Sequence, residues 1–107
     1  MVLYRVVSQA EQEDYISDNQ FRTGNNTLEA KQFFKSKVAV HEYVSNATMQ
    51  GYRPPYSFLF TVYLHEDCLE QASYTEMELD GYEAISIHED YLIDFNRCVN
   101  FVEQELI

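Results

Sequence analysis

Basic side chains are scarce in this sequence of 107 residues. Seven lysines and arginines stand against 18 aspartates and glutamates, which gives a formal net charge of −11. A protein that binds nucleic acid needs a basic face for the phosphate backbone, so we expect no nucleic-acid partner. The deficit is uneven: residues 1–65 carry six acids and six bases, whereas residues 66–107 carry twelve acids and one base, Arg97. This distribution permits an anionic ligand in the first part and a partner protein with a basic surface for the second.

Long hydrophobic runs and clustered cysteines are also lacking. No apolar stretch is long enough to span a membrane, and the first residues do not have the basic start of a signal peptide. The two cysteines, Cys68 and Cys98, do not have the spacing of metal ligands. We therefore expect a cytoplasmic protein with two reduced thiols and no membrane contact. The oligomeric state stays open.

Motifs that carry common enzyme chemistry are missing as well. The three glycines form neither a phosphate-binding loop nor a dinucleotide-binding turn, and there is no nucleophile elbow. His65 and His88 are each followed by Glu-Asp, but a carboxylate in the first turn of a helix explains that repeat, so we expect no metal site. With 46% hydrophobic residues, we expect one folded domain over residues 1–107.

Hydrophobic periodicity and turn residues predict an α+β fold. The sheet is expected to be mixed but mainly antiparallel, with three flanking helices. The expected strands are residues 2–7, 30–35, 56–64, 74–79 and 82–87, and the expected helices are residues 9–18, 37–50 and 89–107. The last helix rests on an apolar stripe with a period of about 3.6 residues. Asp80-Gly81 predicts a two-residue hairpin turn, which would place Glu78 directly opposite Glu83.

Arg5 is unusual because it interrupts the apolar first strand. A guanidinium group in such a strand needs an anionic or carbonyl-rich partner. The strand leads directly into Ser8-Gln-Ala-Glu11, which has the spacing of a helix capping box. Two interpretations follow. Arg5 could hold a ligand phosphate or carboxylate from a rigid strand, or it could pair with one of the chain's own carboxylates.

Three short segments together resemble a known family. They are Leu3-Tyr-Arg-Val-Val-Ser-Gln-Ala-Glu11, Lys31-Gln-Phe-Phe-Lys-Ser36, and the Glu76-Met-Glu78 of the predicted hairpin. This arrangement resembles the small bacterial ADP-ribosyltransferase-like domains of the arginine–serine–glutamate type. The resemblance implies an ADP-ribosyltransferase-like fold and NAD as the cofactor.

The resemblance also implies roles for individual residues. Tyr4 and Arg5 would contact the phosphates or ribose of NAD, and Phe34 and Ser36 would shape the nicotinamide pocket. Glu78, with Glu76 beside it, would stabilise the positive charge that develops on the ribose as the glycosidic bond breaks. Glu83 is the rival for that catalytic position.

Three functional interpretations remain open at this point. The first is an NAD-binding ADP-ribosyltransferase-like domain, active or degenerate, acting as a transferase or an NAD glycohydrolase. It predicts that Arg5, Ser36 and one hairpin glutamate meet in one pocket. The second is a small acidic interaction protein, such as an immunity protein, antitoxin or inhibitor, that covers a basic partner. It predicts that Arg5 is neutralised internally and that an acidic patch forms from Glu76, Glu78, Glu83, Glu89 and Asp90. The third is a structural domain of a larger assembly.

Overall fold

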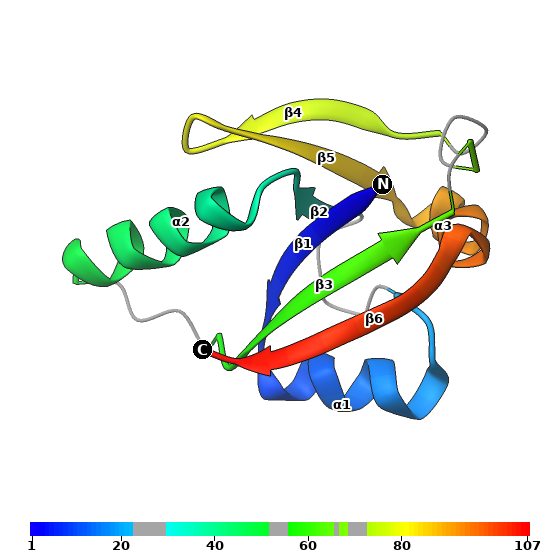
Figure 1. Ribbon diagram of the computed structural model, residues 1–107, viewed down its shortest axis with the longest axis horizontal. Coiled ribbons are helices and arrows are strands. Elements are labelled where there is room, and N and C mark those ends of the chain that lie inside the picture. Colours follow the sequence, from blue (N-terminus) through cyan, green and yellow to red (C-terminus); the bar gives the residue numbers. More distant parts are fainter. Residues whose placement is uncertain (23–29, 52–55, 66, 69–72) are drawn as a thin grey trace.

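A six-stranded antiparallel sheet organises the chain, as the computed structural model shows for residues 1–22, 30–51, 56–65, 67–68 and 73–107 (Figure 1). The strands are β1 (Val2–Val7), β2 (Ala30–Phe34), β3 (Phe58–Leu64), β4 (Thr75–Leu79), β5 (Tyr82–His88) and β6 (Val99–Leu106). The helices are α1 (Gln9–Asp18), α2 (Lys37–Met49) and α3 (Leu92–Cys98), with a 3-10 turn η2 (Glu89–Tyr91) before α3. The predicted α+β class with three helices is confirmed.

The strand order across the sheet is β4-β5-β2-β1-β3-β6, and every neighbouring pair among the described strands is antiparallel. β3 lies in the interior of the sheet and is buried on both faces, as its nearly continuous apolar sequence predicts. β4 and β6 are the two edges. No helix of the described residues has the length and apolar character needed to cross a membrane.

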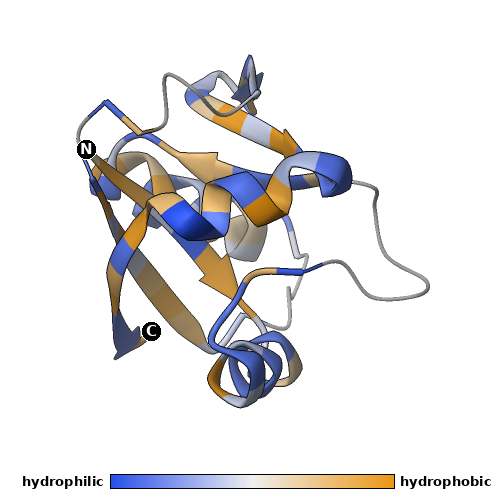
Figure 2. Cartoon of the chain, turned by 90° about the vertical axis from the view of Figure 1, so that its right-hand side faces the viewer, coloured by the Kyte–Doolittle hydropathy of each residue, from blue (hydrophilic) through white to orange (hydrophobic). Residues whose placement is uncertain are grey.

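The two faces of the sheet are covered by different helices. One core cluster joins Leu3 and Phe60 of the sheet to Tyr15 of α1 and Phe95 of α3, so these two helices share a face. The other cluster joins sheet residues to Ala39 and Val40 of α2. We call these the α1/α3 face and the α2 face. Figure 2 shows the central strands largely in the hydrophobic colour and α1 largely in the hydrophilic one, which agrees with a helix that buries only one side chain.

Serine caps fix where the first two helices begin. The Ser8 hydroxyl accepts a hydrogen bond from the Glu11 backbone N–H at 3.2 Å, and the Ser36 hydroxyl accepts one from the Ala39 N–H at 3.3 Å. Each bond satisfies a donor that the helix itself leaves without a partner. The predicted boundaries of both helices are confirmed to within one residue.

The β4–β5 hairpin has the predicted two-residue turn. Asp80 and Gly81 both have positive φ, at 50° and 87°, as the favoured hairpin turn requires. The register then places Glu78 opposite Glu83 and Glu76 opposite Ile85. The hairpin therefore carries three glutamates on the α1/α3 face of its two strands, all of them exposed.

The predicted helix over residues 89–107 is wrong in its second half. Helix α3 ends at Cys98, Val99 has extended backbone (φ −72°, ψ 121°), and β6 continues to Leu106 beside β3. The helical spacing of Val99, Val102 and Leu106 was misleading because β6 is an edge strand whose exposure does not alternate cleanly. As a strand, β6 forms backbone hydrogen bonds with the buried strand β3, whose N–H and C=O groups would otherwise lack partners on that side. The stability gained from these bonds outweighs the local preference of the sequence for a helix.

The expectation of two reduced thiols is also wrong, because Cys68 and Cys98 form a disulfide. Their Cα atoms lie 5.5 Å apart, and 30 positions separate them in sequence. The bond ties the turn after β3 to the end of α3, immediately before β6 begins. Disulfides persist in oxidising compartments. The cytoplasmic location that we inferred from the sequence therefore stays a prediction.

Loss of this disulfide should weaken the fold measurably. In the chain-entropy model a loop of this length is worth about 3–4 kcal/mol, and we expect Cys98→Ser to lower the free energy of unfolding by roughly that amount. Urea titration of the oxidised protein, the reduced protein and the variant measures the effect. The reduced protein should match the variant, and an oxidised protein no more stable than the reduced one would contradict the prediction.

Candidate functional site

Arg5 is neutralised by acceptors of its own chain. Its Nε donates to Glu11 Oε2 at 2.7 Å, its Nη2 donates to Glu11 Oε1 at 2.9 Å, and its Nη1 donates to the Gln32 carbonyl at 2.8 Å. The guanidinium carbon also lies 5.8 Å from the centre of the Phe33 ring. All three nitrogens are thus engaged, in the bidentate geometry that arginine forms best with a carboxylate. The Arg5 side chain is 20% exposed.

Glu11 serves a second cation as well. Lys31 of β2 is buried, and its Nζ lies 3.4 Å from Glu11 Oε1. Burial alone would raise the pKa of Glu11, but the hydrogen bonds and charge of Arg5, together with Lys31, outweigh it and lower that pKa. Burial and the nearby Arg5 charge lower the pKa of Lys31, despite the attraction of Glu11. We call Arg5, Glu11 and Lys31 the Glu11 cluster.

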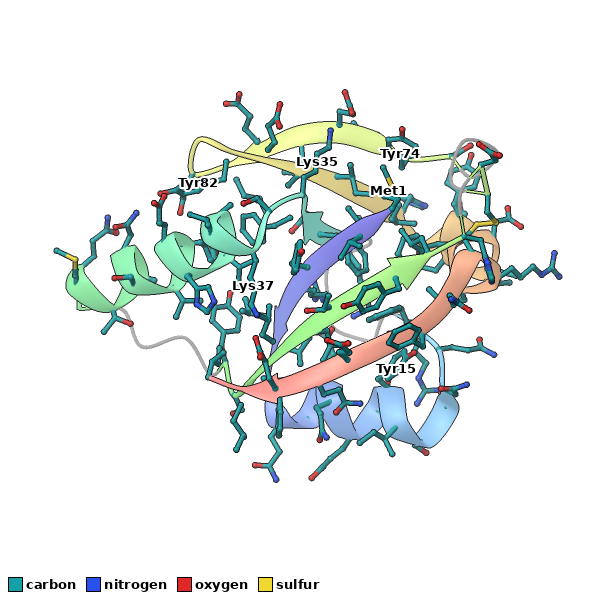
Figure 3. All side chains as sticks on the ribbon, in the orientation of Figure 1. Met1, Tyr15, Lys35, Lys37, Tyr74 and Tyr82 are labelled. Atoms are coloured by element: carbon teal, nitrogen blue, oxygen red, sulfur yellow. A yellow bond between two sulfur atoms is a disulfide. The ribbon has the colours of Figure 1, made fainter. Side chains whose placement is uncertain are left out.

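The hairpin glutamates surround a different cation, Lys35, which Figure 3 shows between β2 and the hairpin. Its Nζ lies 2.7 Å from Glu76 Oε1, and its backbone N–H donates to the Glu83 carbonyl at 3.2 Å. The hydrogen bond to Glu76, with the charges of Glu76 and Glu83, raises the pKa of Lys35. A shallow hollow of about 260 Å³ is lined by Lys35 and by the three hairpin glutamates, Glu76, Glu78 and Glu83.

Ser36 and Glu83 line a neighbouring hollow of about 300 Å³ that also includes Glu42 and Tyr82. The Ser36 hydroxyl already caps α2. A hydrogen bond to Glu42 raises the pKa of the Tyr82 phenol, which also lies 3.4 Å from the Asn46 amide nitrogen. The hollow thus lies between the start of α2 and the end of the hairpin (Figure 3).

The remaining candidates lie on the α2 face of the sheet. The Phe34 ring is buried and packs against Tyr43 of α2, with 5.2 Å between ring centres. Tyr4 is partly buried and packs against the same cluster. These contacts give both aromatic rings a packing role.

The structure brings Ser36, Glu76, Glu78 and Glu83 into one region, but Arg5 lies elsewhere in the sheet. Arg5 is on β1, and β2 and β5 separate it from Glu76 on β4. Three strand spacings amount to about 14 Å. Two buried side chains, Phe33 and Ile85, occupy the sheet positions between them. Arg5 is not among the residues that line the two hollows.

No protein-family model, curated protein or solved structure matches this chain. Among the described residues, no three His, Cys, Asp or Glu side chains are grouped to hold a metal ion. The geometry of the chain itself therefore has to support any assignment of function.

Two partners of the candidate residues were missed from the sequence. Glu11 was identified only as the end of a capping box, although that spacing already placed it one helical turn after the strand that carries Arg5. Lys35 follows Phe33 by two residues, just after the end of β2, and the period of two places both side chains on the face that carries the hairpin glutamates. Both signals were present in the sequence, but their use requires the strand order.

The Glu11 cluster should make stability depend on acidity. A carboxyl group whose pKa is lowered by folding contributes its full stability above its unfolded value of about 4.5 and loses it as pH falls through the folded value. We expect Glu11→Gln to cost about 2 kcal/mol at neutral pH, since it leaves two half-buried cations with a weaker acceptor. Denaturant unfolding from pH 7 to pH 2.5 measures the difference.

The difference between wild type and Glu11→Gln should shrink as pH falls below about 4.5, where Glu11 of the unfolded chain takes up a proton, and should vanish once the pH is below the lowered pKa of Glu11 in the folded protein. Glu13→Gln, an exposed acid on the same helix, is the matched control and should follow the wild-type curve. A constant gap between wild type and Glu11→Gln over this pH range would show that the charge of Glu11 does not stabilise the fold.

Proposed function

We propose that this chain is an acidic interaction domain that covers a basic surface of a partner protein. One observation carries the proposal. Every lysine and arginine in the described part of the chain lies within 4 Å of one of the chain's own carboxylates, so an anionic ligand would have to compete with a carboxylate for each of these side chains. The surplus carboxylates are what the protein presents to its surroundings. An immunity protein, antitoxin or inhibitor would use them in this way.

The hairpin end of the sheet presents a group of exposed carboxylates. We call Glu42, Glu76, Glu78, Asp80 and Glu83 the hairpin acidic surface; all five are exposed. Glu89 and Asp90, which we expected in the same patch, follow β5 at the end away from the hairpin turn. Glu78 and Glu83 lie opposite each other, an arrangement of like charges that is unfavourable in the free protein. Lys35 offsets part of this repulsion from the hollow that it shares with both glutamates. A further cationic side chain from a partner would offset more of it, and this supports the proposal.

The proposal predicts which peptides the protein selects. From a random linear peptide library displayed on phage, we expect sequences rich in lysine and arginine, with affinity that weakens about tenfold between 50 and 200 mM salt. The triple variant Glu76→Gln/Glu78→Gln/Glu83→Gln should lose most of this binding. Selected peptides without basic residues would contradict the proposal.

A matched control separates a specific surface from general attraction to an acidic protein. The variant Glu13→Gln/Asp67→Asn/Asp90→Asn removes the same number of charges from exposed positions outside the hairpin. It should bind the selected peptides as well as wild type does. An equal loss in both triple variants would mean that only net charge matters.

The second candidate function is the NAD-binding ADP-ribosyltransferase-like domain, active or degenerate. The observation in its favour is that Ser36 and Glu83 line one hollow with Tyr82 beside them. A hydroxyl, an aromatic ring and a carboxylate are the groups that the family resemblance assigns to the nicotinamide end of NAD. The hydrogen bonds between Arg5 and Glu11 favour the interaction domain instead. Arg5 would have to break two charge-assisted hydrogen bonds to Glu11 before it could bind the phosphates of NAD.

Calorimetric titration with NAD decides between the two candidates. We expect no saturable heat at millimolar NAD for wild type. Saturable binding that is lost in both Arg5→Ala and Glu83→Gln, and kept in Glu13→Gln, would overturn the interaction proposal. Far-UV circular dichroism of each variant checks that a loss is not caused by unfolding.

A further inference from the structure

The edge strand β6 has a row of backbone groups that face away from the sheet. The Ile107 N–H donates to the Ser57 carbonyl directly opposite, at 3.2 Å, which sets the phase of the β3–β6 ladder. In an antiparallel pair, hydrogen-bonded positions alternate with open ones. The N–H and C=O groups of Val102, Gln104 and Leu106 therefore point outward, away from β3.

A hollow of about 510 Å³ lies beside this strand, on the α1/α3 face. Its lining is more polar than apolar. Five apolar or aromatic residues, Tyr15, Ile16, Val99, Phe101 and Val102, line it together with four residues that carry side-chain amides, Asn19, Asn96, Asn100 and Gln104. Ile16 is 58% exposed although it is apolar. The Gln12 amide nitrogen donates to the Gln104 side-chain oxygen at 3.1 Å, which joins α1 to β6 at this place. Figure 3 shows Tyr15 close to β6, with α1 alongside.

The opposite face of β6 has different chemistry. The Phe101 ring stacks on Tyr63 with centres 4.4 Å apart, yet Phe101 remains 48% exposed. Glu103 and Glu105 follow at the next positions on the same face, and both are exposed. Glu105 Oε1 lies 3.0 Å from Lys37 Nζ, and Glu103 forms a hydrogen bond with the Tyr63 phenol, so a partner's cation would share these carboxylates with groups of the chain itself. A strand added beside β6 would place its own side chains about 5 Å from these three. An arginine or lysine there would meet two carboxylates and an aromatic face.

We propose that an extended segment of a partner protein binds as a seventh strand along β6. The segment pairs antiparallel with the outward groups of Val102, Gln104 and Leu106, as the rest of the sheet does. Its apolar side chains enter the hollow beside α1, and its basic side chains lie over Phe101, Glu103 and Glu105. Alternation of basic and apolar residues is the sequence signature of this partner.

A second copy of this chain fits the edge less well. Antiparallel pairing of two β6 strands about Gln104 would place Glu103 of each copy opposite Glu105 of the other, and pairing about Glu103 would oppose the two Glu103 side chains. Each copy also carries a net charge of −11. Charge complementarity therefore favours a basic segment over self-association.

The edge strand is independent of the hairpin acidic surface, because β6 and β4 lie at opposite edges of the sheet. The inference goes beyond the proposed function in naming a second site, a binding mode and a sequence pattern. Variants at the two edges can therefore test the two proposals separately.

The test uses a labelled hexapeptide, Arg-Val-Arg-Val-Arg-Val, with fluorescence anisotropy and amide chemical-shift mapping of the full chain. The control peptide Arg-Arg-Arg-Val-Val-Val has the same composition and charge. We expect the alternating peptide to bind about tenfold more tightly and to shift the amides of Val102, Gln104 and Leu106. Equal binding of the two peptides, or shifts confined to the hairpin, would overturn the inference.

Backbone methylation tests the pairing itself. Antiparallel pairing directs the N–H groups of the hollow-facing valines toward β6 and those of the arginines away from it. N-methylation of the valines should weaken binding about tenfold, whereas N-methylation of the arginines should leave it nearly unchanged. Equal tolerance of both modifications would overturn the inference.

Variants of the protein separate this site from the hairpin. Glu103→Gln and Ile16→Ser should weaken binding of the alternating peptide, and Glu78→Gln, which removes the same charge at the other edge, should not. Both Glu103 and Ile16 are exposed, so neither change should unfold the protein. If Glu78→Gln weakens binding and Glu103→Gln does not, the hairpin proposal stands and the edge-strand inference fails.

Self-association is a separate outcome. A stable dimer in sedimentation analysis, with protected amides at Val102 and Gln104, would show that a second copy occupies the edge and would overturn the edge-strand inference.

Discussion

Glu11 is the residue on which the arrangement of this fold depends. The α1/α3 face of the sheet is largely apolar, yet it carries Arg5 on β1 and Lys31 on β2, two cations that also repel each other. Neither could remain half-buried without a shared anion. That anion comes from α1, one turn after β1 ends, and it binds Arg5 at two points. The Ser8 cap starts the helix at once, so Glu11 reaches the sheet only if α1 lies back across this face.

The position of α1 determines which parts of the sheet remain open. Held by Glu11 and by the buried Tyr15, the helix runs beside β6, where Gln12 meets Gln104 and a hollow remains. At the other edge the hairpin extends with its glutamates exposed. One sheet therefore ends in two different edges. The hairpin edge carries exposed glutamates, and the β6 edge combines outward-facing backbone groups with a hollow of mixed polar and apolar lining and two carboxylates.

The sequence predicted the elements whose local signals and tertiary environment agree. β1, α1, α2, β3 and the β4–β5 hairpin each have an apolar pattern with a cap or turn residue at the right place. The strand β6 was missed because an edge strand needs no alternation, and its valine spacing fits a helix equally well. The disulfide was missed because spacing alone cannot bring Cys68 and Cys98 together across 30 positions. For the site, the sequence placed Glu78 opposite Glu83 but could not choose a partner for Arg5, which depends on how α1 packs.

Whether Arg5 can bind an anionic ligand depends on competition between that ligand and Glu11. A phosphate that binds Arg5 would have to displace Glu11, and the displaced carboxylate would keep only Lys31 as a partner in a half-buried position. Loss of one partner from a partly buried ion pair is destabilising, and this cost would oppose the binding of a phosphate. A basic partner meets less competition at the exposed carboxylates: Glu83 has Lys35 nearby and Glu103 bonds the Tyr63 phenol, but neither side chain is buried. Among the described residues, each lysine and arginine thus lies beside a carboxylate that an anionic ligand would have to displace, and this supports the proposal of a cationic partner.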